Sequence, residues 1–459
     1  MLRFQDYRQH VQQLTQAALS AVNPAQAVRR FIQLDGRDLV IGDLVHDLDQ
    51  GRVYVVSVGK AAAAMAEATI QILGDDLQSA VVVSKKGSET ASALASQNYH
   101  ALNVLEGNHP VSGEDSIQAT MAVSHLLAQT DVDDLVIFLI SGGTSALLTL
   151  PLMPLPDWQQ LTDVLLASGC TINELNTVRR RLDRIKGGGL VNMAAPAHCI
   201  SLILSDVVGN PLEAIGSGPT IFLDEPAHAA STVLDRYDIE TRLDPEIWQH
   251  IQQVLQQPSD SAKSVGQRNE HIIIGDVRLA ATNALTRAMQ LGFVAQLLTA
   301  RLEGEAREVG RVAAAVAKDM PAGRCLILGG ETTVTIKGNG LGGRNQELAL
   351  AAAIALDGWP ATVIASFATD GEDGPTAAAG AVITGETAKI GRLFGLDPVA
   401  YLDSNDSFHF FQRLDEAACE KEARDEHEEP HPNALLNPGP TGTNVNDLLF
   451  LLTYPRDNS

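Results

Sequence analysis

The feature of this sequence that most constrains its fold is a short apolar run that ends in a polar or glycine turn and is followed by a segment rich in small residues. In the first half of the chain the apolar runs lie at 53–58, 136–140 and 199–204. A short, continuous apolar run is typical of a strand that is buried on both faces of a parallel sheet. We therefore predict an α/β fold in which strands alternate with helices.

Length and charge limit what such a fold can bind. The chain has 459 residues, of which 45% are apolar, and this is enough for two or three domains. Its formal net charge of −23 would repel phosphate backbones and anionic lipid head groups. We therefore expect no nucleic-acid partner and no membrane contact. A small anionic ligand stays compatible with this charge, because salt screens distant charges within about 8–10 Å.

The cysteines and the N-terminus indicate the compartment. The cysteines are far apart in sequence and form no metal-ligand spacing: Cys170, Cys199, Cys325 and Cys419. The N-terminal segment predicts a polar, amphipathic helix without the apolar core of a signal peptide. The longest apolar runs are much shorter than a membrane span. We expect a reduced, cytoplasmic protein, and the sequence leaves open whether it is a homodimer.

The βα pattern loosens between about 222 and 270, where prolines and polar residues accumulate. We interpret this region as a connector between a first domain, residues 1–260, and a second, residues 265–459, that opens with a strand at 271–275. The first is expected to be a Rossmann-like, mostly parallel sheet with helices on both faces. The second is also expected to be mostly parallel. Residues 415–438 are charged and poor in apolar residues, which predicts a mobile insertion.

Polar residues follow the apolar runs of the first domain, at the sheet edge where ligands of open α/β sheets bind. Lys60 follows the first run and is a candidate functional residue. The alternative is a solvated lysine in a loop. Asp206 follows the third run and is placed to hold a divalent cation or to accept a proton. The second run is followed by donors that suit an anion: Ser141, Gly142, Gly143 and Ser145.

Further along the first domain, residues 170–186 are predicted to form one helix that ends at a triple glycine. At helical spacing Asn176 and Arg179 share a face, and Arg179 and Lys186 lie two turns apart. These residues are candidates for binding a carboxylate or a phosphate, with ordinary complements of the helix dipole as the alternative. His109, in a Gly-Asn-His-Pro turn, is at least as well explained as a hydrogen-bonded loop residue as by catalysis.

A glycine-rich stretch carries the main site signal of the second domain. It predicts a strand at 332–336, a loop with Gly338, Gly340 and Gly343, and a helix that begins at Arg344. Glycines leave backbone N–H groups accessible and a helix N-terminus attracts anions, so the stretch suits a phosphate bound beside Arg344 and Asn345. The alternative is a tight turn whose glycines only solve a steric problem.

Two more patterns in the second domain have open interpretations. Asp370 and Asp373 follow a predicted strand at 361–368 and fit a cation site or a base, or else a surface acidic turn. The glycines at 338, 340 and 343 also spell GxGxxG, the outline of a dinucleotide site. The acidic residue expected about 20 positions later does not end the next strand, which argues against that site.

Taken together, several blocks resemble the glycerate 2-kinase family, whose C-terminal portion is called the MOFRL domain. In order they are SVGKA (57–61), GNHP (107–110), SGGTSALL (141–148), NTVRRRLDRIKGGGL (176–190), LSDVVGNPLEAIGSGPT (204–220), GGETTVTIKGNGLGGRNQELAL (329–350), ATDGEDGPT (368–376) and GPTGTNVNDL (439–448). The resemblance extends from about residue 10 to 453. Members have also been described as hydroxypyruvate reductases.

The resemblance implies transfer of the ATP γ-phosphoryl group to the 2-hydroxyl of D-glycerate, with Mg²⁺, in a cleft between two α/β domains. It places a functional lysine at Lys60 and a functional arginine at Arg344. Asp206, Asp370 and Asp373 are then candidates for the metal, and Asp206 also for the base. An NAD(P)H-dependent hydroxypyruvate reductase and a non-catalytic sensor of small anions remain as alternatives.

Overall fold

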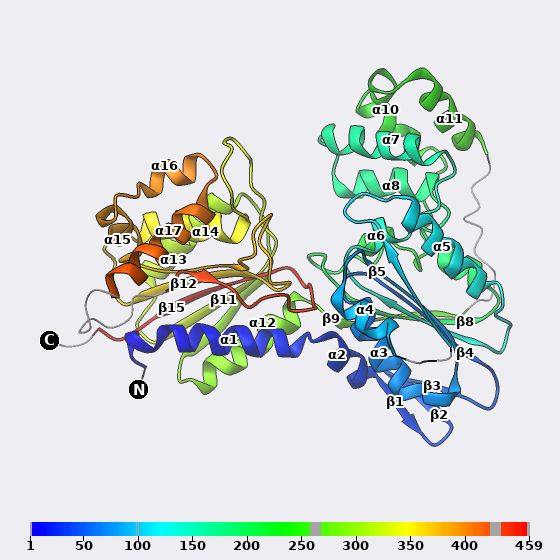
Figure 1. The fold of residues 1–459 in the computed structure, drawn as a ribbon, viewed down its shortest axis with the longest axis horizontal. Coiled ribbons are helices and arrows are strands. Elements are labelled where there is room, and N and C mark those ends of the chain that lie inside the picture. The colour runs from blue at the N-terminus through cyan, green and yellow to red at the C-terminus, as the bar shows by residue number, and fades with distance from the viewer. Residues whose placement is uncertain (1, 98, 100, 258–267, 423–432, 457–459) are drawn as a thin grey trace. The chain divides into compact units, whose positions relative to one another are not determined.

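The computed structural model describes residues 2–456 except 98, 100, 258–267 and 423–432 (Figure 1). It divides into two compact units. The N-terminal unit is Pro24–Gly275, and the C-terminal unit joins Met1–Asn23 to Asp276–Ser459. The predicted placement of the active site between two domains stays a prediction.

The N-terminal unit is built on a six-stranded sheet in the order β6-β5-β4-β7-β8-β9. The strands are β4 (Val53–Val58), β5 (Leu77–Lys85), β6 (Leu102–Gly107), β7 (Leu135–Ile140), β8 (His198–Leu204) and β9 (Asn269–Gly275). Every pairing is parallel. This is the doubly wound order, and its reversal point, where ligands bind, lies between β4 and β7. The predicted parallel α/β sheet is confirmed for this unit.

Helices and a small sheet complete the N-terminal unit. They are α2 (Pro24–Phe31), α3 (Ala62–Leu73), α4 (Glu89–Ala95), α5 (Glu114–Leu127), α6 (Thr144–Leu147), α9 (Gly189–Ala194) and the antiparallel β1 (Ile32–Asp35), β2 (Asp38–Ile41) and β3 (Leu44–Asp47). Four further helices share a separate apolar core and form a group of their own in Figure 1: α7 (Leu155–Ala167), α8 (Ile172–Leu182), α10 (Ala229–Arg236) and α11 (Pro245–Gln256).

The C-terminal unit contains a second six-stranded sheet, in the order β10-β11-β15-β12-β13-β14. The strands are β10 (Val294–Leu302), β11 (Arg324–Gly330), β12 (Thr362–Ala368), β13 (Gly380–Thr384), β14 (Leu435–Leu436) and β15 (Asp447–Thr453). The helices are α1 (Tyr7–Ala21), α12 (Val277–Gln290), α13 (Ala306–Asp319), α14 (Arg344–Leu356), α15 (Thr387–Leu393), α16 (Pro398–Asp403) and α17 (Ser407–Glu422).

The sheet of the C-terminal unit corrects a prediction. Among the described strands of this sheet only β10 and β11 pair in parallel, whereas β15 is antiparallel to both β11 and β12, and β12 is antiparallel to β13. The last strand of the chain enters the middle of the sheet, and no helix lies between β12 and β13. Antiparallel strands need no crossover helix, so βα alternation earlier in the chain could not reveal this mixed sheet.

The predicted domain boundary also differs from the structure at both ends. The helix α1 packs on α12 and therefore belongs with the C-terminal unit. The strand β9, predicted to open the second domain, pairs with β8 and closes the first sheet. Of the predicted insertion at 415–438, residues 423–432 lie outside the described residues, and α17 and β14 contain part of the remainder.

Candidate active site

The reversal point of the N-terminal sheet brings together the residues that follow β4 and β7. The Lys60 backbone N–H donates to the Gly142 carbonyl oxygen at 2.8 Å. The Ala61 backbone N–H donates to Ser141 Oγ at 3.1 Å. The sequence prediction that these strand ends meet is therefore correct. The loop after β7 is fixed by the turn that carries Lys60.

Gly142 and Gly143 are surrounded by polar side chains from other strand ends. A Cβ atom at Gly142 would lie 2.1 Å from Asp206 Oδ2, and one at Gly143 would lie 3.2 Å from His109 Cδ2 and 3.6 Å from Lys60 Cγ. Gly143 also has a φ of 91°, which disfavours any residue with a side chain. The two glycines thus let Lys60, His109 and Asp206 approach one loop.

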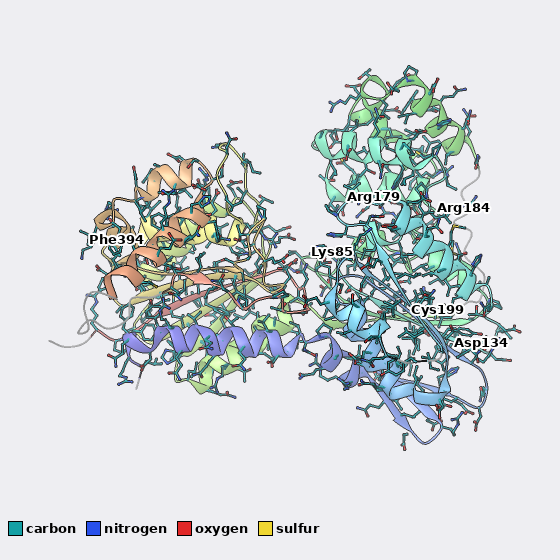
Figure 2. All side chains as sticks on the ribbon, in the orientation of Figure 1. Lys85, Asp134, Arg179, Arg184, Cys199 and Phe394 are labelled. Atoms are coloured by element: carbon teal, nitrogen blue, oxygen red, sulfur yellow. The ribbon has the colours of Figure 1, made fainter. Side chains whose placement is uncertain are left out.

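Positive charge accumulates at this edge of the sheet. Lys85 ends β5, and Lys60 lies two residues beyond the end of β4 (Lys85 is labelled in Figure 2). Burial, together with the charges of Lys60 and Lys85, lowers the pKa of His109 to about 4. At neutral pH the imidazole is therefore uncharged and adds no further repulsion between these groups. The positive charge of this edge is compatible with the anion that the sequence predicts beside the loop at 141–145.

A chain of hydrogen bonds links this edge to α8. Ser145 Oγ lies 3.0 Å from Ser217 Oγ, and Ser217 Oγ donates to Asn176 Oδ1 at 2.9 Å. Ser217 is fully buried and has a φ of 64°, a strained conformation for a serine. Asn176 is thus connected to the loop after β7, and the connection runs through Ser217, which sequence reasoning did not single out.

The predicted helix at 170–186 ends early, and this changes the interpretation of Lys186. Helix α8 ends at Leu182, where Asp183 is extended and accepts from Thr149 Oγ1, Leu150 N and Ile185 N. Lys186 therefore does not share a helical face with Arg179. Its ammonium group is buried and donates to the carbonyl oxygens of Ser145 at 2.7 Å and Leu148 at 2.5 Å. The predicted carboxylate ligand is instead a support for α6.

Burial shifts the ionisation of both basic residues in this region. It lowers the pKa of Lys186 to about 8, with the charge of Asp183 acting in the opposite direction. Burial also lowers the pKa of Arg179, again against the charge of Asp183 (Arg179 is labelled in Figure 2). An arginine stays charged under such a shift, so Arg179 remains the candidate for an anion ligand on α8.

In the C-terminal unit, Arg344 opens α14 and is held by two carboxylates. Its Nε and Nη2 atoms donate to the two oxygens of Asp447 at 2.5 and 2.9 Å, and its Nη1 lies 3.0 Å from Glu331 Oε1. Burial opposes the guanidinium charge, but the bonds and charge of Asp447 outweigh it and raise the pKa of Arg344. Asp447 begins β15 in the middle of the sheet, a position that sequence reasoning could have noticed.

The glycine loop before α14 bonds and packs within the protein, which favours the steric alternative over the predicted anion cradle. Residues 332–336 form no strand, and Ile336 is 78% exposed. The Gly338 and Gly340 N–H groups donate to Asn405 Oδ1 and to the Ser404 carbonyl, and a Cβ at either glycine would overlap residues 404–406. The steric alternative therefore accounts for these glycines.

Asp373 occupies the N-terminus of α14. Its carboxylate accepts from the backbone N–H groups of Asn345 at 3.1 Å and Gln346 at 2.8 Å, and a Cβ at Gly343 would lie 2.2 Å from its Cγ. Burial raises the pKa of Asp373 to about 6, although these N–H donors act in the opposite direction. The predicted phosphate position at this helix is thus filled by a side chain of the protein.

The predicted metal ligands do not gather into a cage. Within the residues that the structure describes, no group of three or more His, Cys, Asp or Glu side chains could hold a metal ion. Asp373 caps α14, Asp206 follows β8 in one unit, and Asp370 follows β12 in the other.

Comparison with known proteins gives the family. A model described as a domain of unknown function, DUF4147, matches residues 10–252, and the MOFRL family model matches residues 324–447. A D-glycerate 2-kinase of Thermotoga maritima is 39% identical over 436 residues, which are 93% of this chain and 96% of that protein. The chain belongs to the MOFRL-type glycerate kinase family.

Further relatives of this glycerate kinase family member support the same assignment to the family. Human glycerate kinase is 35% identical over 98% of this chain and 93% of its own length, and a glycerate 2-kinase of Pyrococcus horikoshii is 34% identical over 97% of each. The crystal structure of a glycerate kinase from Thermotoga maritima matches with a TM-score of 0.81 and 37% identity, over 98% of this chain and all of that one. The resemblance inferred from the sequence blocks is confirmed.

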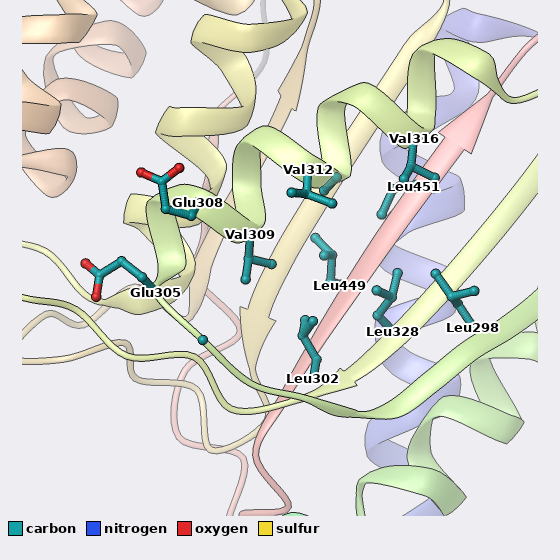
Figure 3. A pocket seen from close by; sticks show the side chains of 12 residues that line it. Leu298, Leu302, Glu305, Glu308, Val309, Val312, Val316, Leu328, Leu449 and Leu451 are labelled. Atoms are coloured by element: carbon teal, nitrogen blue, oxygen red, sulfur yellow. The ribbon is translucent and has the colours of Figure 1, made fainter.

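Two further findings bear on this family member. A hollow of about 290 Å³ lies between α13 and the sheet of the C-terminal unit, and leucines and valines dominate its lining (Figure 3). Such a lining does not suit a charged substrate, so the strand ends remain the better site.

Among the residues described, no helix has the length and apolarity to cross a bilayer.

Proposed function

We propose that this chain is a D-glycerate 2-kinase, which transfers the γ-phosphoryl group of ATP to the 2-hydroxyl of D-glycerate and yields 2-phosphoglycerate and ADP. The observation that carries the proposal is the match to glycerate kinases over nearly the full length of both chains. The strand ends of the N-terminal unit supply chemistry that supports it, because a phosphoryl group and a carboxylate both need positive charge.

The proposed roles follow from position. Lys60 lies at the reversal point beside the Ser141–Gly143 loop and supplies charge for an anionic substrate. Arg179 offers a second cation on α8 for the glycerate carboxylate. Arg344 supplies charge from the C-terminal unit, where Asp447 fixes the direction of its guanidinium group.

Mg²⁺ suits the carboxylates of Asp206 and Asp370, which follow strands. This ion binds through one or two carboxylates and the phosphates of the nucleotide, so it does not need a cage made by the protein alone. Asp206, against Gly142 in the N-terminal unit, and Asp370, after β12 in the C-terminal unit, are each a candidate to hold it. When bound, it neutralises charge on the phosphates.

The two competing hypotheses have less support. A dinucleotide site needs the glycines to follow a strand directly, but residues 332–336 are not a strand and the Gly338 and Gly340 N–H groups bond within the protein. A non-catalytic sensor of small anions would bind its ligand at the same strand ends but would not hydrolyse or transfer phosphate from ATP.

One experiment separates the three hypotheses. The purified protein is incubated with D-glycerate, ATP and MgCl₂, and in parallel with hydroxypyruvate and NADH or NADPH. ADP that forms only when D-glycerate is present supports the kinase. Oxidation of the nicotinamide supports the reductase. Neither product, with D-glycerate bound in calorimetry, supports the sensor.

A further inference from the structure

We propose that His109 takes the proton from the acceptor hydroxyl during phosphoryl transfer. This assignment rests on the proposed kinase function, because it names a group that acts within that reaction. His109 follows β6 in the Gly-Asn-His-Pro turn, one strand away from Lys85 and two strands away from Lys60. It is therefore carried to the ligand edge of the sheet by the fold itself.

The His109 ring faces the loop after β7. The nearest atoms to a Cβ built on Gly143 are His109 Cδ2 at 3.2 Å and Nε2 at 3.3 Å, followed by Lys60 Cγ at 3.6 Å. Asp206 Oδ2 lies 2.1 Å from a Cβ built on the neighbouring Gly142. A substrate bound by Lys60 over the glycine pair therefore lies within reach of the imidazole.

The His109 ring differs from three other sheltered histidines, which bond to a partner: His198 to Glu270, His271 to the Thr220 carbonyl and His10 to the Tyr454 hydroxyl. His46 Nε2, in β3, also has no hydrogen-bond partner. The part of the chain that the structure describes provides no hydrogen bond to the His109 ring, although the ring is half-buried. The hydrogen-bonded loop histidine considered from the sequence is thus not what the fold contains.

The surroundings of the ring suit a base whose pKa rises when substrate binds. Burial, followed by the charges of Lys60 from the turn after β4 and Lys85 from the end of β5, holds the pKa of His109 at about 4. This pKa leaves the imidazole unprotonated at neutral pH. Anions that pair with these lysines remove the repulsion, and the imidazole becomes more basic when substrate arrives.

The step balances without any further reagent. The 2-hydroxyl oxygen forms a bond to the γ-phosphorus, and the bond from that phosphorus to the bridging oxygen breaks, so ADP leaves with the electron pair. The hydroxyl proton moves to a ring nitrogen of His109. The imidazolium then returns the proton to solvent after product release.

His109→Gln tests the proposal, because glutamine keeps a polar side chain but cannot accept this proton. His125, exposed near the end of α5, gives the matched control His125→Gln. General base catalysis contributes roughly 10²–10⁴-fold, so we expect kcat of His109→Gln to fall at least about 100-fold while KM for D-glycerate stays within about threefold. The control should retain its kcat.

A second readout measures the imidazole of the wild-type protein directly. In wild-type protein, the His109 imidazole is assigned by comparing NMR spectra with those of His109→Gln, and its pKa is measured with and without D-glycerate plus a non-hydrolysable ATP analogue. We expect the pKa to rise from about 4 in the free protein to above about 5 in the complex.

A kcat within about tenfold of wild type for His109→Gln, or an imidazole pKa that does not rise in the complex, overturns the proposal. If the wild-type protein forms no ADP from D-glycerate and ATP, the proposed kinase function fails instead. The two failures are therefore distinguishable.

Discussion

Replacing Asp447 with asparagine tests whether this carboxylate holds the functional arginine in place. The Asp447 carboxylate accepts hydrogen bonds from Nε and Nη2 of Arg344 at 2.5 and 2.9 Å, and its side chain is only 10% exposed. An asparagine can accept from one of these atoms, but it carries no charge and turns an N–H₂ group toward the other. The loss of one charge-assisted hydrogen bond in a buried setting costs about 1.5–3 kcal/mol.

A surface pair provides the matched control. Asp357 pairs with Arg392, and the two side chains are 37% and 48% exposed. Exposed pairs of this kind contribute about 0.2–1 kcal/mol. Urea unfolding of the full chain should therefore show a larger loss for Asp447→Asn than for Asp357→Asn, by about 1–2 kcal/mol. Glu331 still contacts Arg344 in the variant and limits the loss.

The same variant should also lose activity. An arginine displaced by about 1 Å can cost on the order of 100-fold in rate, so we expect kcat/KM with D-glycerate to fall by at least about tenfold in Asp447→Asn and to stay unchanged in Asp357→Asn. Equal unfolding energies for the two variants, together with unchanged kcat/KM, would refute the reasoning that Asp447 fixes Arg344.

Three further expectations concern the N-terminal site and its supports. Lys60→Ala should reduce kcat/KM more than about tenfold and the exposed Lys389→Ala should not; a smaller loss removes Lys60 from the reaction. Gly142→Ala places a methyl group 2.1 Å from Asp206 Oδ2, so activity should fall while circular dichroism stays native; full activity argues against Asp206 as a participant. Burial lowers the pKa of Lys186 from 10.5 to about 8, so between these pH values the unfolded chain binds more protons than the folded chain. The free energy of unfolding should therefore rise with pH between about 8 and 10.5. Lys186→Met should flatten that rise in urea unfolding, and identical slopes contradict the burial argument.

The strand ends of the N-terminal unit could be predicted from the sequence because local signals decide them. A continuous apolar run marks a strand buried in a parallel sheet, and the next residues must lie at its carboxyl edge. Lys60, Ser141 and Asp206 were found in this way. Their approach to one loop then followed from the parallel pairing of β4, β7 and β8.

The contacts that determine the other residues join segments far apart in the chain. The Asp373 carboxylate accepts from the N-terminal N–H groups of α14, and residues 404–406 pack against the glycine loop and accept from its N–H groups. A glycine pattern that suits a phosphate is thus used for packing within the protein. Lys186 looks like a surface cation at the end of a helix until Asp183 ends α8 and its ammonium group reaches two carbonyl oxygens. No local pattern distinguishes these uses, because each depends on a partner that only the fold supplies.

The measurement that tests the central claim most directly is ³¹P NMR of the product formed from D-glycerate, ATP and MgCl₂, with authentic 2- and 3-phosphoglycerate as standards. The account predicts 2-phosphoglycerate and an equal amount of ADP, both dependent on the protein and on D-glycerate. A product with the phosphate on the 3-hydroxyl, or no phosphoglycerate at all, would contradict it.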